Sequence, residues 1–371
     1  MRLTADHILF PDADAPAPGF LEIEGERIVA ASRGNAPWVA DEHLSGTVVP
    51  GYVDVHVHGG GGASFVTEDP AVARQALAAH RRLGVTTMVA SLVTGSLPDL
   101  ERQVECLAGL IESGELAGIH LEGPWLSLEY KGAHAPDLLA DPALGDVTRL
   151  LDAGRGTIRM VTIAPEREGA LDAIRLMAER GVVAAIGHTD ADYDTVHAAI
   201  NAGASGATHL FNAMAPLRHR EPGPVLALWE DQRVYLELIL DGVHVRPELV
   251  AFVAATEPDR FVLVTDAMAA AAAQDGEYIL GDLPVEVRDG VARIAGTDTI
   301  AGSTLTLDRA VRNAVAAGIP FTQAIRAATS LPADYLSLHD VGRLAVGKRA
   351  DLVVLDSDLV ATRVMQRGAW I

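Results

Sequence analysis

A chain of 371 residues in which 49% of the side chains are hydrophobic can bury a large core, and its length suggests one large domain with a smaller one beside it. Its net charge of −21 repels the phosphates of nucleic acids and of anionic membranes, so neither is expected as a partner. No apolar run approaches the length of about 20 residues that a membrane helix needs. The chain has a single cysteine, Cys106, and its N-terminus does not resemble a signal peptide. Together these two features predict a cytoplasmic location.

Both ends of the chain show β patterns. The N-terminal segments GFLEIEGERIVAAS and TVVPG alternate apolar with polar residues or carry β-branched residues, which favours short strands. The last segment, GRLAVGKRADLVVLDSDLVATRVMQRGAWI, has no helical period and reads similarly. Because these ends flank one long central region, we expect residues 1–48 and 336–371 to meet in a single small β-sandwich domain.

The central region, residues 49–335, alternates apolar strands with amphipathic helices. The expected strands are Val49–Val57, Thr86–Val93, Ala117–Leu121, Arg159–Ile163, Val182–Ile186, Gly206–Leu210, Val234–Leu240 and Phe261–Val264. The expected helices include Pro70–Leu83, Pro98–Glu112, Ala170–Arg180, Tyr193–Ala202 and Pro247–Ala255. This alternation predicts an α/β fold, a (β/α)₈ TIM barrel.

A doubly wound open sheet is the alternative fold for the central region. The run Gly59–Gly62 is not the glycine fingerprint that such dinucleotide-binding folds carry, so the barrel is favoured. A longer insertion, Ala270–Ile300, follows the eighth predicted strand and contains its own turns. We expect it to form a hairpin over the mouth of the barrel.

Histidine and acidic residues stand where the predicted strands end. They are His56, His58, Glu122, His188, His209, His244 and Asp266. In a barrel all these ends face one mouth, where catalytic residues sit. Residues i and i+2 of a strand face the same side, so both histidines of the HVH motif can point inward. Imidazoles with a carboxylate suit zinc, iron or a related metal, and an open coordination position lets such a metal activate water.

A structural role is the alternative for each of these residues taken singly, because one histidine at a strand end is more often a packing residue than a ligand. Their joint placement at successive strand ends favours the metal interpretation. The remaining histidines are interpreted as structural: His7, His43, His80, His120, His134, His197, His219 and His339. Cys106 lies in a helical pattern and is interpreted as a small buried hydrophobe.

Longer motifs carry a family resemblance. VVPGYVDVHVHG, followed by strand-end Glu, His, His and Asp, resembles the amidohydrolase superfamily. More narrowly, HLEGPWLSLEYKGAHAP, IGHTDADY, THLFNAMAPLRHREPG, ILDGVHV, LVTDAM and IAGSTLTLDRAV resemble the deacetylases of N-acetylglucosamine 6-phosphate within it. The resemblance covers nearly the whole chain and implies a metal-dependent hydrolase that releases acetate from this sugar phosphate, in amino-sugar catabolism or recycling.

The resemblance also implies roles for residues of the metal site. Glu122, His188 and His209 match the principal metal ligands of the family, while His56 and His58 match the ligands of a second metal. Zinc is expected, with iron, manganese or cobalt as alternatives, and one or two ions per subunit, which Glu122 would bridge. The barrel shows no metal-bridging lysine, and this separates the chain from urease-like and dihydroorotase-like enzymes.

The substrate side of the site follows from the same resemblance. Asp266 matches the general acid/base of the family, which takes a proton from the attacking water and gives it to the departing amine, and a helix cap is its structural alternative. Arg220 resembles a phosphate-binding arginine that reaches across a homodimer interface. Asn212 and Ala213 resemble phosphate contacts made through backbone N–H groups. The residues that match sugar contacts or a substrate-closing loop are Ala133, His244, Ile300, Ala301 and Gly302.

Two other functions stay open from the sequence. Another amidohydrolase, acting on a related amino sugar or an N-acyl amino acid, would have no need of the phosphate residues Asn212 and Arg220. A metal-bound regulatory or structural barrel would have no need of Asp266, because a structural zinc site is closed by its ligands. The sequence leaves open the identity and number of the metals and the tolerance for N-acetylgalactosamine 6-phosphate.

Overall fold

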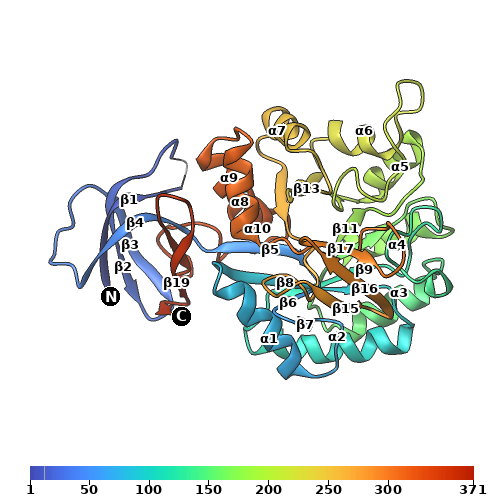
Figure 1. Cartoon of the computed structure of the whole chain (residues 1–371), viewed down its shortest axis with the longest axis horizontal. Helices are drawn as coiled ribbons and strands as arrows, with labels where there is room; N and C mark the ends of the chain where they lie inside the picture. Colours follow the sequence, from blue (N-terminus) through green and yellow to red (C-terminus); the bar gives the residue numbers. More distant parts are fainter. Residues whose placement is uncertain (12) are drawn as a thin grey trace.

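The computed structural model describes residues 1–11 and 13–371, and most of them form a barrel of parallel strands surrounded by helices (Figure 1). The barrel strands are β5 (Tyr52–Val57), β8 (Val85–Val93), β9 (Gly118–Glu122), β10 (Ile158–Ile163), β11 (Val183–Ile186), β12 (Gly206–Ala207), β13 (Tyr235–Ile239) and β14 (Phe261–Val264). The helices that follow them in turn are α1 (Pro70–Arg81), α2 (Leu97–Glu112), α3 (Leu144–Ala153), α4 (Ala170–Glu179), α5 (Tyr193–Ala202), α6 (Gly223–Glu230), α7 (Pro247–Thr256) and α8 (Leu307–Ala316). The predicted (β/α)₈ barrel is confirmed.

The barrel closes between its first and last strands. Each strand pairs with the next one along the chain, from β5 to β14. Just beyond β14, the backbone N–H of Asp266 donates to the carbonyl of His56 at 2.9 Å. At the same seam, Thr265 Oγ1 donates to the buried carboxyl of Asp54 at 2.7 Å. These contacts hold Asp266 beside the histidines of β5.

Local sequence explains where strands and helices begin. Every residue of β5 and β8 is buried, as expected for parallel strands covered on both faces, although β5 alternates valine with the buried polar residues Asp54 and His56. Asp69 caps α1 by accepting a hydrogen bond from the N–H of Ala71 at 2.8 Å, and Pro70 occupies the first helical position. Of the helices in the described part of the chain, none is both long and apolar enough to cross a membrane.

Both ends of the chain contribute to one further sheet, which lies to the left of the barrel in Figure 1. Its order is β20-β19-β18-β4-β1-β2-β3. The bounds are β1 (Arg2–Ile8), β2 (Ala17–Glu24), β3 (Arg27–Arg33), β4 (Glu42–Pro50), β18 (Leu352–Leu355), β19 (Ala361–Gln366) and β20 (Ala369–Trp370). The sheet buries its own apolar cluster, which includes Leu3, Leu21, Ile28, Leu44 and Leu352. The small β domain predicted from both termini is confirmed, while its boundaries, 1–48 and 336–371 against 49–335, stay a prediction.

Two predicted strands differ from the observed ones. The predicted strand Val49–Val57 is divided at Gly51 between β4 of the terminal sheet and β5 of the barrel. A Cβ at Gly51 would lie 2.2 Å from Thr86 Oγ1, so the crossing needs a residue without a side chain. The predicted strand Gly206–Leu210 ends at Ala207, because the chain then turns sharply toward the barrel mouth.

The insertion after β14 is larger than the predicted hairpin. It forms a three-stranded antiparallel sheet of β15 (Gly276–Leu280), β16 (Leu283–Arg288) and β17 (Val291–Ile294). Its apolar face packs on Val93 and Met268, which lie at the carboxyl ends of barrel strands. The insertion therefore covers part of the barrel mouth, as predicted. Further short elements are β6 (Gly59–Gly60), β7 (Ala63–Ser64), the 3₁₀ helix η1 (Pro136–Leu138), α9 (Phe321–Ala327) and α10 (Ser330–Tyr335).

Candidate metal centre and active site

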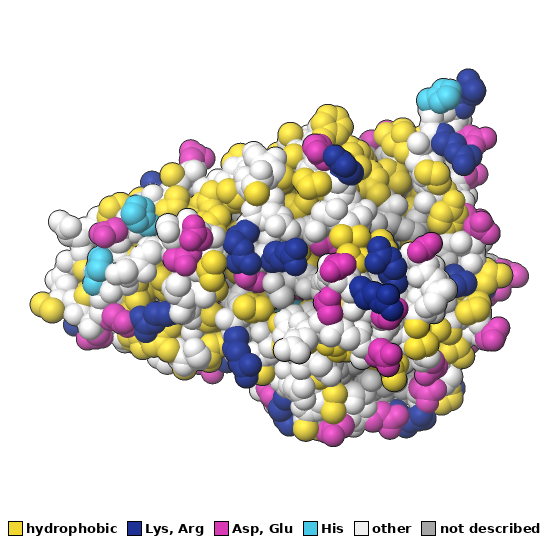
Figure 2. Space-filling model, in the orientation of Figure 1, with side chains coloured by type: hydrophobic (Ala, Val, Ile, Leu, Met, Phe, Trp, Pro, Cys, Tyr) yellow, Lys and Arg dark blue, Asp and Glu magenta, His cyan; other side chains and the backbone are white. Residues whose placement is uncertain are grey.

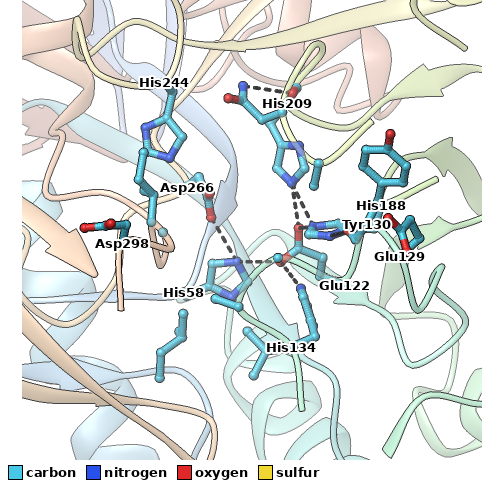
Figure 3. Close-up of a pocket in the computed structure, with 18 residues that line it drawn as sticks. His58, Glu122, Glu129, Tyr130, His134, His188, His209, His244, Asp266 and Asp298 are labelled. Atoms are coloured by element: carbon cyan, nitrogen blue, oxygen red, sulfur yellow. Dashed lines mark hydrogen bonds and ion pairs between the residues drawn. The ribbon is translucent and has the colours of Figure 1, made fainter. Parts of the chain in front are cut away.

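The predicted ligands converge at the carboxyl ends of the barrel strands. They surround a cavity of about 410 Å³ whose wall is drawn in Figure 3. His58 follows β5 directly and Glu122 is the last residue of β9. His188, His209 and Asp266 each stand two residues beyond the end of a strand. All five side chains are buried, although they come from segments far apart in the sequence.

Glu122 joins two histidines on one side of the cluster. Its Oε1 atom lies 3.1 Å from His188 Nε2 and 3.0 Å from His209 Nε2. The two Nε2 atoms are 3.1 Å apart. His188 is held from behind, because its Nδ1 lies 2.9 Å from the carbonyl oxygen of Tyr130 and donates to it. The three donor atoms thus face a single point, as the principal ligand set predicted from the sequence requires.

The other oxygen of Glu122 faces a second group. Its Oε2 atom lies 3.1 Å from His58 Nε2, which in turn lies 3.2 Å from Asp266 Oδ1. His56 Nε2 is 3.2 Å from His58 Nε2 and 3.4 Å from Asp266 Oδ1. His56 Nε2 also lies 3.6 Å from Glu122 Oε1, so Glu122 stands among all four histidines, as a carboxylate bridging two ions would.

The donor set fits divalent metal ions. Metal–ligand bonds of 2.0–2.1 Å in a tetrahedral site place neighbouring donors about 3.3 Å apart, close to the spacings observed here. The Nδ1 atoms of His58 and His209 are buried without a hydrogen-bond partner, so among the described residues the polar contacts of these rings are those of their Nε2 atoms. Imidazole nitrogens and carboxylates suit zinc and neighbouring transition metals and do not single out one of them.

Both carboxylates of the cluster are ionised. Burial raises the pKa of Glu122, but His56 and the hydrogen bonds from the surrounding histidines lower it more, so that its pKa lies well below the ordinary value. Burial also raises the pKa of Asp266, and His56 and His58 bring it below the ordinary value. Asp266 is consequently a carboxylate that is able to accept a proton inside the cavity.

Several of these residues adopt unusual backbone conformations. His188 has a φ of 48°, His209 of 30° and Asp266 of 48°. Positive φ is uncommon for residues other than glycine, and such strain gathers where a side chain must be presented at a site. The turns lift the side chains over the strand ends, and this explains why β12 is shorter than predicted.

The predicted substrate contacts divide into two groups. Those that line the cavity are Ala133, Asn212, Ala213, His244, Ile300 and Gly302. Ala301 is fully buried behind the wall. Arg220 lies elsewhere, in a separate depression that also includes Tyr130, which lines both hollows. Among the described residues of the cavity wall there is no lysine or arginine.

The N–H donors of Asn212 are engaged within its own turn, and its contact with a phosphate stays a prediction. The N–H of Asn212 donates to the carbonyl of His209 at 3.0 Å, and its Nδ2 donates to the same oxygen at 3.1 Å. These donors stabilise the turn at His209 and are not directed at the cavity. Opposite, His244 is oriented by Asp241, whose Oδ2 lies 2.7 Å from His244 Nδ1.

The comparison with protein families agrees with this geometry. A family model described as the amidohydrolase family matches residues 47–370, which include the whole barrel and the C-terminal strands of the terminal sheet. The chain belongs to the amidohydrolase family.

Solved and curated proteins similar to this amidohydrolase carry more specific names. The N-acetyl-D-glucosamine-6-phosphate deacetylase of Mycobacterium smegmatis is 52% identical, with a TM-score of 0.97 and 100% of both chains covered. The N-acetylglucosamine-6-phosphate deacetylase of Thermotoga maritima is 34% identical, with a TM-score of 0.89 and coverage of 100% of this chain and 99% of that one. The N-acetylgalactosamine-6-phosphate deacetylase of Escherichia coli O157:H7 is 39% identical over 326 residues, 86% of each chain.

The sequence analysis of this amidohydrolase missed His134. It was interpreted as structural, but its Nε2 lies 3.6 Å from Glu122 Oε2, and Figure 3 shows its ring beside that carboxylate. Burial lowers the pKa of His134 to about 4, so the ring is neutral near pH 7. His134 directly follows Ala133, in the loop that was predicted to close over the substrate, and this position could have indicated that it belongs to the site. His120, by contrast, contacts Ser91 and Thr162, as a packing role requires.

A pair of carboxyl groups, Glu166 and Asp190, lines a separate surface hollow of this amidohydrolase. Glu166 accepts hydrogen bonds from Thr189 Oγ1 at 2.6 Å and from the N–H of Asp190 at 3.0 Å. Ser127 Oγ donates to the carboxyl of Asp190 at 2.5 Å. Burial, and then the hydrogen bond with Asp190, raise the pKa of Glu166 to about 7. This group is protonated in the folded chain at pH values where an exposed glutamate is ionised.

Replacing Glu166 with glutamine should therefore remove a pH dependence of stability. Between the ordinary pKa of 4.5 and about 7 the folded chain holds a proton that the unfolded chain has lost. The free energy of unfolding then falls as pH rises through this range, by up to about 3 kcal/mol. Glutamine imitates the protonated acid, so the variant should be more stable than the wild type at pH 8. Chemical denaturation at pH 5 and pH 8 measures the difference, with Glu168→Gln, an exposed carboxylate of the same loop, as control. An unchanged pH dependence in Glu166→Gln would contradict the assignment.

Proposed function

We propose that this amidohydrolase hydrolyses the acetamide of N-acetylglucosamine 6-phosphate to glucosamine 6-phosphate and acetate. The observation that carries the proposal is the placement of Asp266 Oδ1 within 3.2–3.4 Å of two histidine Nε2 atoms, at one side of a sugar-sized cavity. A structural metal site is closed by its ligands and has no such open wall. The 52% identity to a deacetylase of this sugar phosphate over the whole chain supports the same reaction.

The histidine and glutamate cluster would hold the metal. We assign Glu122, His188 and His209 to a principal ion and His56 and His58 to a second one. Zinc is the first expectation, and iron, manganese or cobalt are the alternatives. An ion bound there would polarise the acetyl carbonyl and make the attacking water more acidic.

Asp266 would manage the protons of the reaction. Its carboxylate takes a proton from the water as the new C–O bond forms at the acetyl carbon. It then gives this proton to the sugar nitrogen as the C–N bond breaks, because an unprotonated amine is a poor leaving group. The carboxylate is in the ionised form that the first step needs, because His56 and His58 lower its pKa more than burial raises it, and a metal ion that acidifies the water would offset its weak basicity.

The sugar phosphate would lie across the cavity wall. Its contacts would be Ala133, Asn212, Ala213, His244, Ile300 and Gly302, which line the cavity, with the buried Ala301 supporting the last two from behind. A phosphate needs cationic or N–H donors, and the wall offers no lysine or arginine among its described residues. We therefore propose that Arg220 of a second copy supplies the charge, so that the functional unit is a homodimer.

The loop of Arg220 and helix α7 both expose apolar side chains that a second copy could cover. Leu217 is 49% exposed and Phe252 is 58% exposed, and Phe252 packs edge-on against Trp229 at 5.6 Å between ring centroids. Figure 2 shows apolar side chains gathered over α7, while the rest of this face mixes acidic and basic groups. Exposed apolar patches of this kind mark contact surfaces.

Replacing Arg220 with alanine should raise KM for the phosphorylated sugar by about 10–100-fold, because charge-assisted hydrogen bonds contribute about 1.5–3 kcal/mol each. The kcat value should change much less, since the phosphate is remote from the acetamide. Steady-state kinetics of acetate release measure both constants. Arg218→Ala is the matched control, as it removes an equal charge from the same loop. An unchanged KM in Arg220→Ala would contradict the phosphate role.

The function itself is tested by incubating the metal-loaded protein with N-acetylglucosamine 6-phosphate and measuring acetate. N-acetylgalactosamine 6-phosphate belongs in the same assay, because a 39% identical relative bears the name of its deacetylase. Unphosphorylated N-acetylglucosamine and an N-acyl amino acid test the alternative substrates. Absence of acetate from all four with zinc, iron, manganese and cobalt would overturn the proposal.

A further inference from the structure

We propose that Glu237 is a positioning residue that fixes the ring of His56 for metal binding. Glu237 lies in the middle of β13 and is fully buried. Its Oε2 atom is 3.0 Å from His56 Nδ1, on the side of the ring that faces away from the cavity. The inference rests on the metal centre of the proposed function and adds a residue that lies outside the ligand set.

The contact determines which nitrogen of His56 carries the proton. A carboxylate can only accept, so His56 Nδ1 must donate, and the lone pair of the ring is left on Nε2. That Nε2 atom faces His58 Nε2 at 3.2 Å and Asp266 Oδ1 at 3.4 Å. A carboxylate behind a metal-binding histidine fixes its tautomer and raises its basicity as a ligand. His58 and His209 have no such partner at Nδ1.

Glu237 also contacts the other half of the centre. The same Oε2 atom accepts a hydrogen bond from the N–H of His209 at 3.4 Å, and the N–H of Leu210 donates to the carbonyl of Glu237 at 2.8 Å. His209 is one of the residues with positive φ. One buried side chain therefore supports the ring of a ligand in one group and the backbone of a ligand in the other.

A purely structural role explains the burial poorly. The second oxygen, Oε1, makes no hydrogen bond of ordinary geometry: its neighbour is the buried hydroxyl of Tyr335, which donates to Met160 Sδ at 3.2 Å and whose pKa is raised by burial and then by Glu237. An incompletely paired carboxylate costs free energy in the interior, and an apolar side chain of similar size would fill the space without that cost. A role in positioning His56 accounts for a charged residue at this place.

Metal binding by Glu237→Leu and Glu237→Gln tests the inference without any substrate. Zinc ions alone are titrated against each metal-free variant, and bound metal per chain is counted. Glu237→Leu should bind the ion of the His56 group about 10–100-fold more weakly than the wild type, the range found for residues behind ligands. Glu237→Gln keeps an acceptor for Nδ1–H and should lose less. Long-range ¹H–¹⁵N NMR of His56 should show protonated Nδ1 in the wild type and a mixture of tautomers in Glu237→Leu.

Asp308→Asn is the matched control. Asp308 is also buried, with one oxygen paired to Arg312 at 2.7 Å and the other without a partner, but it lies on α8 and not in the cavity wall. It should bind metal like the wild type. In a His56→Asn background, Glu237→Leu should cause only a small further loss, that of its weak hydrogen bond from the N–H of His209, because the residue acts mainly through His56.

The outcomes separate this inference from the proposed function. Equal zinc affinity in Glu237→Leu and the wild type would overturn it, as would a full additional loss in the His56→Asn background. A wild type that binds zinc but releases no acetate would overturn the deacetylase proposal and leave the role of Glu237 standing. A wild type that binds no metal would overturn both.

Discussion

Replacing Asp266 with asparagine should lower kcat for deacetylation by about 10³-fold, within the 10²–10⁴ range expected for general acid/base catalysis. Asparagine has the same shape and its amide oxygen can still face His56 and His58, but it cannot take up and return a proton. KM should change little, because the sugar contacts remain. Acetate release under saturating substrate measures the effect, and elemental analysis shows whether metal is still bound.

The charge change alone does not explain such a loss. Asp282→Asn removes the same charge from the exposed turn between β15 and β16, and its kcat should stay within a few-fold of the wild type. If Asp266→Asn turned over at a near-normal rate with its metal bound, the proton transfer would belong to another group. His134 and His244, which line the same cavity, would then be the first candidates.

The sequence predicted the barrel and the grouping of the candidate ligands, because both depend on strand ends. Strands buried on both faces give apolar runs, and a parallel barrel brings every carboxyl end to one mouth. The metal donors could therefore be grouped before any distance was known. The turn that shortens β12 could not be foreseen. The positive φ of His209 accompanies hydrogen bonds to Asn212, three residues further on, and to Glu237, 28 residues away in the sequence.

His134 and Glu237 could not be singled out from the sequence, for a physical reason in each case. His134 lies in a loop 12 residues after Glu122, and loop residues follow no period that would fix their direction. Glu237 stands between two leucines in YLELI, which resembles the alternation of a half-exposed strand. In a barrel strand that is buried on both faces, however, a glutamate must point either into the barrel or into the helical layer, and either place calls for a partner. The burial of both faces of this strand, and with it the need of Glu237 for a partner, is known only once the fold is known.

Arg220 shows a different limit. Its motif predicted a phosphate contact, yet the residue lies outside the cavity of its own chain. A single sequence contains no information on where a second copy sits. The geometry of one chain supports the prediction only indirectly, through the lack of a cation in the described cavity wall.

Replacing Glu122 with glutamine should remove both metal ions, the largest loss we expect from one substitution. Each carboxylate oxygen of Glu122 faces a different donor group, with Oε1 3.0–3.1 Å from His188 and His209 and Oε2 3.1 Å from His58. Glutamine offers one oxygen and an N–H₂ group that cannot coordinate, and it removes a charge that offsets those of the ions. Metal affinity should fall by more than the about 10–100-fold typical of residues behind the ligands.

His58→Asn is the comparison that separates the two groups. It removes a donor from the second group alone, so it should lose one ion and keep the one held by His188 and His209. Bound metal per chain, counted after equilibration with zinc, should then fall in steps from the wild type to His58→Asn to Glu122→Gln. Retention of both ions in Glu122→Gln would exclude the bridge. If the wild type and His58→Asn both bound a single ion, His56 and His58 would be structural and the centre would have one metal. The donor spacing is compatible with one ion or with two, and the order of these metal counts decides between the two possibilities.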